Sequence, residues 1–577
     1  MDIHAYYTSE LAYLRETAQA FAREHPANAA ALQGRGNDPD VERLLEGVAF
    51  LTAGLRARID QAGMQLAHSL AELTLPHLLR SLPATTIVEL TPNIRALRAR
   101  QRVPKGQPLL ARPLEGTACR FTTCWDVDLW PIELQGARLD RTRSDRTVIR
   151  LDLAVSDAGR GALGEEAPLR FFLYHHEPAL PATLMLWLRR HLIGVTVLST
   201  KGGGATTTLP ADTAIRALSH HQHPIFPWPA TAPAGYRSVL EVMALPDGHC
   251  FFEFHGLHHA EIADASALTV ELTFERPPPL PAAIGPDTFR LHCTPAINLF
   301  QVPGEAIAYD PLVREAIVRA DAVDPRHMEV FDVTSVIAAD RSQGARRTYA
   351  PFTRVATSAG RRPPCYALRR AYSPIDGGLD TYLSLVEPPE LRGKEGEVLS
   401  LQLLCTNRAL ARGLQVRDLG EAQTGALFTT YTNITPVSPP VRMALGIEAL
   451  WRLLSHLAAN QRGPADAEAL RGLLSLYNFY AGADAQLGPT NERQIEAVRQ
   501  VSREAVTRLI RGVPVRAIRT TIELDERGFP GQGRAHLFGA ALSELFASLV
   551  NINAASEVRV VLLPSKQEYV WPVRIGT

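Results

Sequence analysis

The stretch from residue 38 to residue 80 constrains the fold of this chain more than any other part. Its apolar residues recur in alternating steps of four and three, the 3.5-residue period of a helix that packs along a partner helix. Asp38 is a suitable N-cap and Pro39 suits the first helical position, so we expect a helix of roughly 60 Å, with Gly63 as the point where it would kink or split. The large apolar members of this helix seam are Val41, Leu45, Val48, Leu55, Ile59, Leu66 and Leu73.

Two interpretations of the seam stay open on the pattern alone. The helix packs on the core of its own chain, or the seam is an interface shared between subunits. A shorter helix, expected from Ala5 to Glu24, has the same spacing and ends at His25-Pro26. Residues 1–83 are therefore predicted to form a helical hairpin or open pair with a seam on both members.

Beyond Pro83 the apolar period changes to two, which is typical of strands. We expect a β-rich, sandwich-like domain over residues 84–286 and a second β-rich domain over residues 287–436. The expected strands include Thr86–Thr91, Cys119–Leu134 with a turn, Thr147–Val155, Leu169–Tyr174, Ile193–Leu198, Val239–Met243, Cys250–Phe254, Ala267–Phe274, His327–Val336 and Val398–Cys405.

The last part of the chain, residues 437–577, alternates helical and strand-like patterns and predicts an α/β domain. The fold class is therefore α+β and multidomain, with N-terminal long helices, β-rich middle domains and a C-terminal α/β domain. The expected helices are Gly446–Asn460, Ala465–Tyr480, Asn491–Arg511 and Gly539–Val550, and the expected strands are Val513–Leu524 and Glu557–Leu563.

Composition excludes some classes of function. The chain has 577 residues, and its 60 Lys and Arg balance 60 Asp and Glu, which argues against a broad nucleic-acid-binding surface. The first residues lack the apolar region of a signal peptide, and no window is apolar enough for a membrane span. The six cysteines are scattered and are expected to be reduced thiols, so we expect a cytoplasmic protein.

The motif search does not favour catalysis, and we expect no cofactor, metal or catalytic residue. Histidines crowd three segments, but no HExxH or CxxC pattern supplies a converging ligand set. Lys201 and the three glycines after it lack the order of a phosphate-binding loop. The crowded histidines are His175, His176, His220, His221, His223, His255, His258 and His259.

Several segments resemble, in the same order, motifs of the TssF family, a baseplate subunit of the bacterial type VI secretion system. The first are YYTSELAYLRETAQAFAREHP, DPDVERLLEGVAFLTAGLRARID and LPHLLRSLPATTIVEL. The later ones are CRFTTCWDVDLWPIEL, TPAINLF, LLCTNRALARGL, LWRLLSHLAAN and FGAALSELFASLVNINAASEV. The chain departs from the family pattern at Ala411, where a proline is expected, and at Ala554-Ala555, where a bulkier pair is expected.

The resemblance implies a structural role. TssF pairs as two copies with one TssG, and with TssE and TssK it builds a baseplate wedge around the VgrG spike hub, beneath the contractile sheath and docked on the membrane complex. The family is similar in fold to wedge proteins of contractile phage tails. Two alternatives stay open: a β-sandwich enzyme that uses the histidine-rich loops, and a carbohydrate-binding module that uses Trp125, Trp130 and Trp228 as stacking faces.

Overall fold

The structure is a computed structural model in which the described residues divide into two units, one of residues 3–25 and 39–74 and one that begins at Leu75. The described ranges are 3–25, 39–94, 97–141, 146–157, 162–199, 206–218, 222–229, 232–258, 265–280, 282–310, 312–322, 324–339, 346–352, 363–373, 378–387, 397–420, 429–442, 463–510, 512–550 and 554–576.

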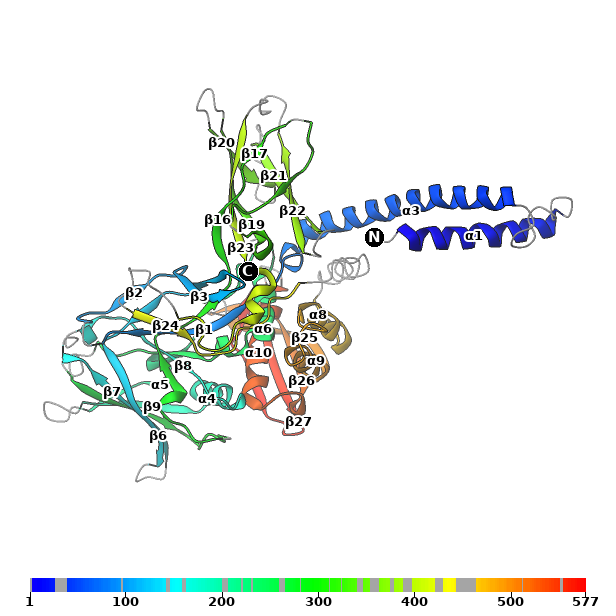
Figure 1. Cartoon of the computed structure of the whole chain (residues 1–577). Helices are drawn as coiled ribbons and strands as arrows, with labels where there is room; N and C mark the ends of the chain where they lie inside the picture. Colours follow the sequence, from blue (N-terminus) through cyan, green and yellow to red (C-terminus); the bar gives the residue numbers. More distant parts are fainter. Residues whose placement is uncertain are drawn as a thin grey trace. The chain divides into compact units, whose positions relative to one another are not determined.

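The first unit is a pair of helices that lie side by side (Figure 1). They are α1 (Ile3–Glu24) and α3 (Pro39–Thr74). With 36 residues, α3 spans about 54 Å. It is one helical element through Gly63, so the predicted long helix is present and is not split there. The predicted Asp38 cap lies outside the described residues.

The second unit begins with a sheet whose strands come from distant parts of the chain. Its order is β24-β1-β15-β4-β3. β1 pairs antiparallel with β15 and with β24, so that Val88 lies between Thr294 and Asn433. Phe121 and Tyr431 belong to the core of this region. The strands are β1 (Thr85–Pro92), β3 (Pro108–Leu114), β4 (Thr117–Thr123), β15 (Cys293–Ile297) and β24 (Thr429–Asn433).

Two further antiparallel sheets have the orders β10-β9-β13-β7-β6 and β11-β12-β8-β14. The alternation predicted from sequence is visible in β13, where every second side chain is buried. A two-stranded sheet joins β2 (Gln101–Val103) and β5 (Val127–Leu129). The strands of the two larger sheets are β6 (Ile132–Arg141), β7 (Thr147–Val155), β8 (Leu169–Leu173), β9 (Leu192–Ser199), β10 (Thr206–Leu209), β11 (Ile215–Ala217), β12 (Phe251–Phe254), β13 (Ala267–Phe274) and β14 (Phe289–Leu291).

An eight-stranded sheet has the order β16-β23-β19-β20-β21-β22-β18, with β17 also paired to β23. Its core gathers aromatic and aliphatic residues such as Tyr349, Tyr366 and Leu401. The strands are β16 (Phe300–Pro303), β17 (Ile307–Ala308), β18 (Ala316–Val318), β19 (Glu329–Ala339), β20 (Arg346–Pro351), β21 (Cys365–Tyr372), β22 (Leu379–Val386) and β23 (Val398–Thr406).

The last sheet combines the long hairpin β25 (Val498–Ile510) and β26 (Val513–Asp525) with β27 (Ala555–Leu563). β26 and β27 are parallel and are connected through α10 (Gln532–Ser548), as expected for an α/β arrangement. The short strands β28 (Glu568–Val570) and β29 (Arg574–Ile575) both pair with β27.

The helix α10 is the centre of a helical layer. Its side chains are buried on every side from Gly533 to Ala547. Close helix contacts depend on glycine, since a Cβ added at Gly533 would lie 2.2 Å from the Ala182 carbonyl carbon and one at Gly235 would lie 2.5 Å from the Glu544 carbonyl oxygen. The other helices of this unit are α4 (Ala179–Arg190), α5 (Ala211–Ala214), α6 (Ala234–Ala244), α8 (Ala467–Tyr477) and α9 (Leu487–Glu496).

The α+β multidomain class is confirmed, but two predicted elements are wrong. Residues Val239–Met243 lie in the helix α6, because a short buried apolar run has no period that separates strand from helix. Of the helix predicted from Asn491 to Arg511, only the first residues are helical, at the end of α9. The rest forms β25, because pairing with β26 overrides local helix propensity. The helix predicted at Gly446–Asn460 lies outside the described residues.

The predicted domain limits at residues 83, 286 and 436 stay predictions. The two units meet in sequence at residue 74/75, near the first limit. The sheet that contains β1 also contains β15 and β24, which come from the region predicted to be the second β-rich domain. Pairing between strands that lie far apart in the chain gives no local sequence signal.

Candidate interaction surface

The two helices of the first unit pack through small side chains. Ala22 on α1 and Ala49 and Ala53 on α3 are almost completely buried. Polar contacts add to this packing: the Tyr6 hydroxyl donates to an Asp60 carboxylate oxygen at 2.9 Å, and this bond raises the pKa of Tyr6. Because alanines occupy the helix contact, most of the described large apolar side chains of α3 lie elsewhere on its surface.

Five of these side chains form one exposed line, which we call the α3 stripe. They follow one another in steps of four, three, four and four, so they share one face of the helix. Each is between 45% and 70% exposed. Monomeric proteins rarely leave a contiguous apolar surface of this length uncovered, and such surfaces mark interaction sites. The α3 stripe consists of Leu44, Val48, Leu51, Leu55 and Ile59.

The structure places the predicted seam residues in three groups. Val48, Leu55 and Ile59 belong to the α3 stripe, whereas Leu45 is half-buried and does not. The side chains of the remaining predicted residues, Val41, Leu66 and Leu73, lie outside the described part of the chain.

The predicted seam did not include Leu44 and Leu51, which belong to the α3 stripe. Because Leu44 and Leu45 are adjacent, a line of apolar residues with the 3.5-residue period can run through either one. The predicted seam runs through Leu45. The buried alanines at 49 and 53 are the signal that could have fixed the phase, because small residues mark the side where two helices approach closely.

The histidine groups were the other sequence candidate for a site. Within the described residues, no three or more His, Cys, Asp or Glu side chains are arranged to hold a metal ion. The rings of His175 and His176 lie 4.0 Å apart, and the His175 Nδ1 accepts the Glu177 backbone N–H. His220, His221 and His259, like the loop at Lys201, lie outside the described residues.

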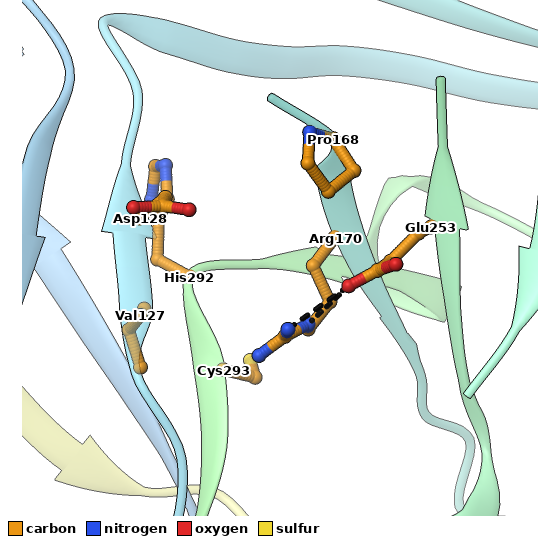
Figure 2. Close-up of a pocket in the computed structure, with 7 residues that line it drawn as sticks. All are labelled: Val127, Asp128, Pro168, Arg170, Glu253, His292 and Cys293. Atoms are coloured by element: carbon orange, nitrogen blue, oxygen red, sulfur yellow. Dashed lines mark hydrogen bonds and ion pairs between the residues drawn. The ribbon is translucent and has the colours of Figure 1, made fainter. Parts of the chain in front are cut away.

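A small polar pocket gathers groups that could suggest chemistry (Figure 2). Arg170 donates to Glu253 at 2.9 Å, and His292 and Cys293 lie beside this ion pair. The His292 Nε2 accepts the Trp130 backbone N–H at 3.1 Å, and burial lowers the pKa of His292 to about 4. Burial raises the pKa of Cys293, so the Cys293 thiol and the His292 imidazole are both neutral.

This pocket does not fit a substrate. Its volume of about 20 Å³ holds roughly one water molecule. A nucleophilic cysteine needs a depressed pKa, whereas the Cys293 thiol donates to the Leu291 carbonyl at 3.3 Å and stays protonated. The cluster is an internally satisfied group of polar side chains that holds neighbouring strands together.

The tryptophans proposed as sugar platforms face the protein interior. Trp130 is fully buried and Trp125 is 5% exposed, with its Nε1 donating to the Pro224 carbonyl at 3.0 Å. Trp228 is half-buried against His77 and donates to the Ala232 carbonyl. All six cysteines are free and buried, as expected for reduced structural thiols. None of the described helices is both long and apolar enough to cross a membrane.

A long helical pair with an exposed apolar stripe, joined in one chain to several β-sheets, is typical of a subunit that assembles with other chains. Comparison with known proteins gives the family. The family described as "Type VI secretion system, TssF" matches residues 1–577, which is the whole chain. A relative from Pseudomonas aeruginosa, named type VI secretion system component TssF1, is 29% identical over 96% of this chain and 95% of the relative.

Two solved structures share the fold. One is a chain of a TssK-TssF-TssG baseplate subcomplex determined by cryo-electron microscopy, with a TM-score of 0.75 and 24% identity over 93% of this chain and 100% of that chain. The other comes from a type VI secretion baseplate complex, with a TM-score of 0.63 and 24% identity over the full length of both chains.

The chain belongs to the TssF family of the type VI secretion system. TssF is a component of the baseplate of that system. The resemblance drawn from the sequence motifs is therefore confirmed. Among the described residues, the histidines and tryptophans that suggested an enzyme or a carbohydrate-binding module give these alternatives no support.

Proposed function

We propose that this chain is a structural subunit of the baseplate wedge and that it acts by assembly, without catalysis. Family membership identifies the secretion system, and the α3 stripe is the observation in this chain that carries the assembly role. An exposed face of leucine, isoleucine and valine at helical spacing fits the hydrophobic centre of an obligate interface.

The proposed arrangement has two copies of this chain with one TssG, together with TssK and TssE. The solved relatives support TssG and TssK as partners, because one of those relatives is a chain of a TssK-TssF-TssG baseplate subcomplex. We further propose that the assembled wedge surrounds the VgrG spike hub beneath the contractile sheath. It would be cytoplasmic and would reach the inner-membrane complex through TssK.

The energy available from the α3 stripe is large enough for a stable interface. Full burial of one Leu, Ile or Val side chain contributes about 1.5–3 kcal/mol. The five stripe residues together expose the equivalent of about three complete side chains, which gives roughly 5–9 kcal/mol before the cost of association is subtracted. A matching apolar helix from TssG or from the second copy would bury this face by knobs-into-holes packing.

The experiment that tests the proposal is co-expression with the TssG-like protein of the same organism, followed by light scattering on the purified complex. We expect a mass equal to two of these 63.2 kDa chains and one TssG. A chain that purifies without TssG, and stays monomeric at high concentration, would contradict the proposed assembly. Metal analysis of the same sample tests the enzyme alternative, since stoichiometric zinc would revive it.

A further inference from the structure

An arginine-lined groove lies where β23 ends and the chain turns into the short 3-10 helix η10 (Arg408–Gly413). It has a volume of about 290 Å³, near the lower end of the range for ligand pockets, roughly 300 Å³. The described residues that line it include three arginines, Arg408, Arg412 and Arg442, and one carboxylate, Glu329. None of these residues belongs to the α3 stripe.

Among the described lining residues, the one carboxylate is already paired and does not neutralise Arg412. Arg442 forms an ion pair with Glu329, whose side chain is almost completely buried. Arg408 Nη1 donates to the Arg326 carbonyl at 3.0 Å, and Arg412 Nη2 donates to the Pro440 carbonyl at 3.2 Å. The Pro440 carbonyl oxygen orients the Arg412 guanidinium without cancelling its charge. Among the described residues, no carboxylate lies within ion-pair distance of Arg412.

The backbone holds the arginines in place. Leu82 and Val441 exchange two backbone hydrogen bonds of 2.7 and 3.1 Å, which join the two edges of the groove. Arg408 has a φ of 53°, in the left-handed region that costs energy for a residue with a side chain. Its backbone N–H donates to the Thr406 hydroxyl at 3.3 Å, which helps to fix this conformation. Strained residues of this kind often occur at binding sites.

A second observation points to a missing partner. Ser81 lines the groove and is only 8% exposed, yet its hydroxyl has no hydrogen-bond partner within the described part of the chain. A buried hydroxyl without a partner costs about 1–3 kcal/mol. An acceptor group bound in the groove would remove this cost if the serine rotamer turned toward it.

The lining selects the chemistry of the ligand. Guanidinium groups and a hydroxyl donor favour an anion with planar oxygen acceptors. The other lining residues, such as Pro83, Ala409 and Ala483, are apolar and suit a short aliphatic stem. A free phosphate would leave these apolar walls and most of the volume unused. A glutamate or aspartate with its neighbouring main chain matches both parts of the groove.

We propose that this groove binds an acidic segment of a partner polypeptide, whose carboxylate is held by Arg412. The inference rests on the proposed function, because it takes the partner to be another subunit of the baseplate. The contact lies on the second unit of the chain and is therefore independent of the α3 stripe.

Carbodiimide cross-linking of the purified complex tests the proposal directly. The reagent joins an amine to a carboxylate in contact with it, so the Arg412→Lys variant supplies a reactive amine at the groove. We expect a cross-link from position 412 to an aspartate, a glutamate or the chain end of a partner subunit, located by mass spectrometry. The Arg314→Lys variant, at an exposed position that does not line the groove, is the matched control and should give no such product.

A cross-link from position 412 to a carboxylate within the same molecule, seen as a product that stays at the mass of one chain, or no cross-link in an intact complex, would overturn the proposal. Failure of the wild-type complex to form would instead contradict the proposed function. In that case the isolated full-length chain still tests the groove. A fluorescein-labelled hexaglutamate peptide should bind, and its affinity should fall at least tenfold, or about 1.4 kcal/mol, in the Arg408→Gln, Arg412→Gln double variant.

Three comparisons complete this second test. The Arg314→Gln variant and a hexaglutamine peptide separate groove binding from general charge attraction. Equal hexaglutamate affinity in the wild-type chain and the double variant would refute the proposal. Displacement of the peptide by inorganic phosphate at an equal concentration would show a simple anion site and would also refute it.

Discussion

Two acidic substitutions on the α3 stripe should abolish partner binding without unfolding the chain. Leu55 and Ile59 are 59% and 70% exposed, so replacing both by aspartate changes the free energy of unfolding by less than about 0.5 kcal/mol each. In the complex the same side chains would be buried. Their lost burial removes at least about 2 kcal/mol, roughly a 30-fold change in affinity, and two buried unpaired carboxylates add to this loss.

Partner retention during affinity purification and light scattering measure the effect of the Leu55→Asp, Ile59→Asp variant. Circular dichroism and thermal unfolding show whether the chain stays folded. Phe50→Asp is the matched control, because Phe50 is 61% exposed but lies on a different face of α3. If the double variant retains its partner as well as the wild type does, the stripe has no role in binding. If Phe50→Asp loses the partner to the same extent, the whole helix pair, rather than the stripe, binds.

Three further predictions concern stability. Burial raises the pKa of Glu241 to about 8. The wild-type chain should therefore lose stability relative to Glu241→Gln as the pH rises from about 4.5 to 8. The expected loss, measured by urea unfolding, is up to about 1.4 kcal/mol per pH unit. Burial lowers the pKa of His77 to about 3. The chain should therefore keep its full stability above pH 6.5 and lose stability as the pH drops toward 3. This change of stability with pH should be smaller in His77→Gln. Gly533→Ala should lower the free energy of unfolding by about 1–3 kcal/mol or more, because the added Cβ meets the α4 backbone. Gly54→Ala, whose Cβ meets nothing within 4 Å, should raise it by up to about 1 kcal/mol. Thermal unfolding of both variants checks the contrast.

Elements with strong local periodicity were predictable from the sequence, and elements defined by distant partners were not. The 3.5-residue period gave α3, and strict alternation gave β7 and β13. The helix α4 was not predicted, and its Pro181 lies in the first turn, where proline is tolerated. The predicted Asn491–Arg511 helix is β25 from Val498 onward, because the ladder to β26 satisfies the backbone of this segment.

The sequence predicts an apolar face on α3 but does not determine which residues form it. A seam on α3 follows from spacing, whereas the choice between Leu44 and Leu45 depends on which side α1 covers. That side is set by Ala49 and Ala53, whose role is visible only once the two helices are seen together. The arginine groove could not be predicted, because Ser81, Arg412 and Arg442 come together through the Leu82–Val441 bridge between distant segments.

The sheet topology also limits how this subunit could change shape in a contracting assembly. A pivot near residue 286 would separate β1 from β15 and break the antiparallel ladder that joins Thr85–Glu89 to Cys293–Ile297. Losing such a ladder exposes both edges and buried residues such as Ile87 and Val88 to water. Movements that keep every ladder intact are much cheaper. We therefore expect the β1–β15 amides to stay protected in hydrogen exchange before and after contraction, and loss of protection there on contraction would contradict this reasoning.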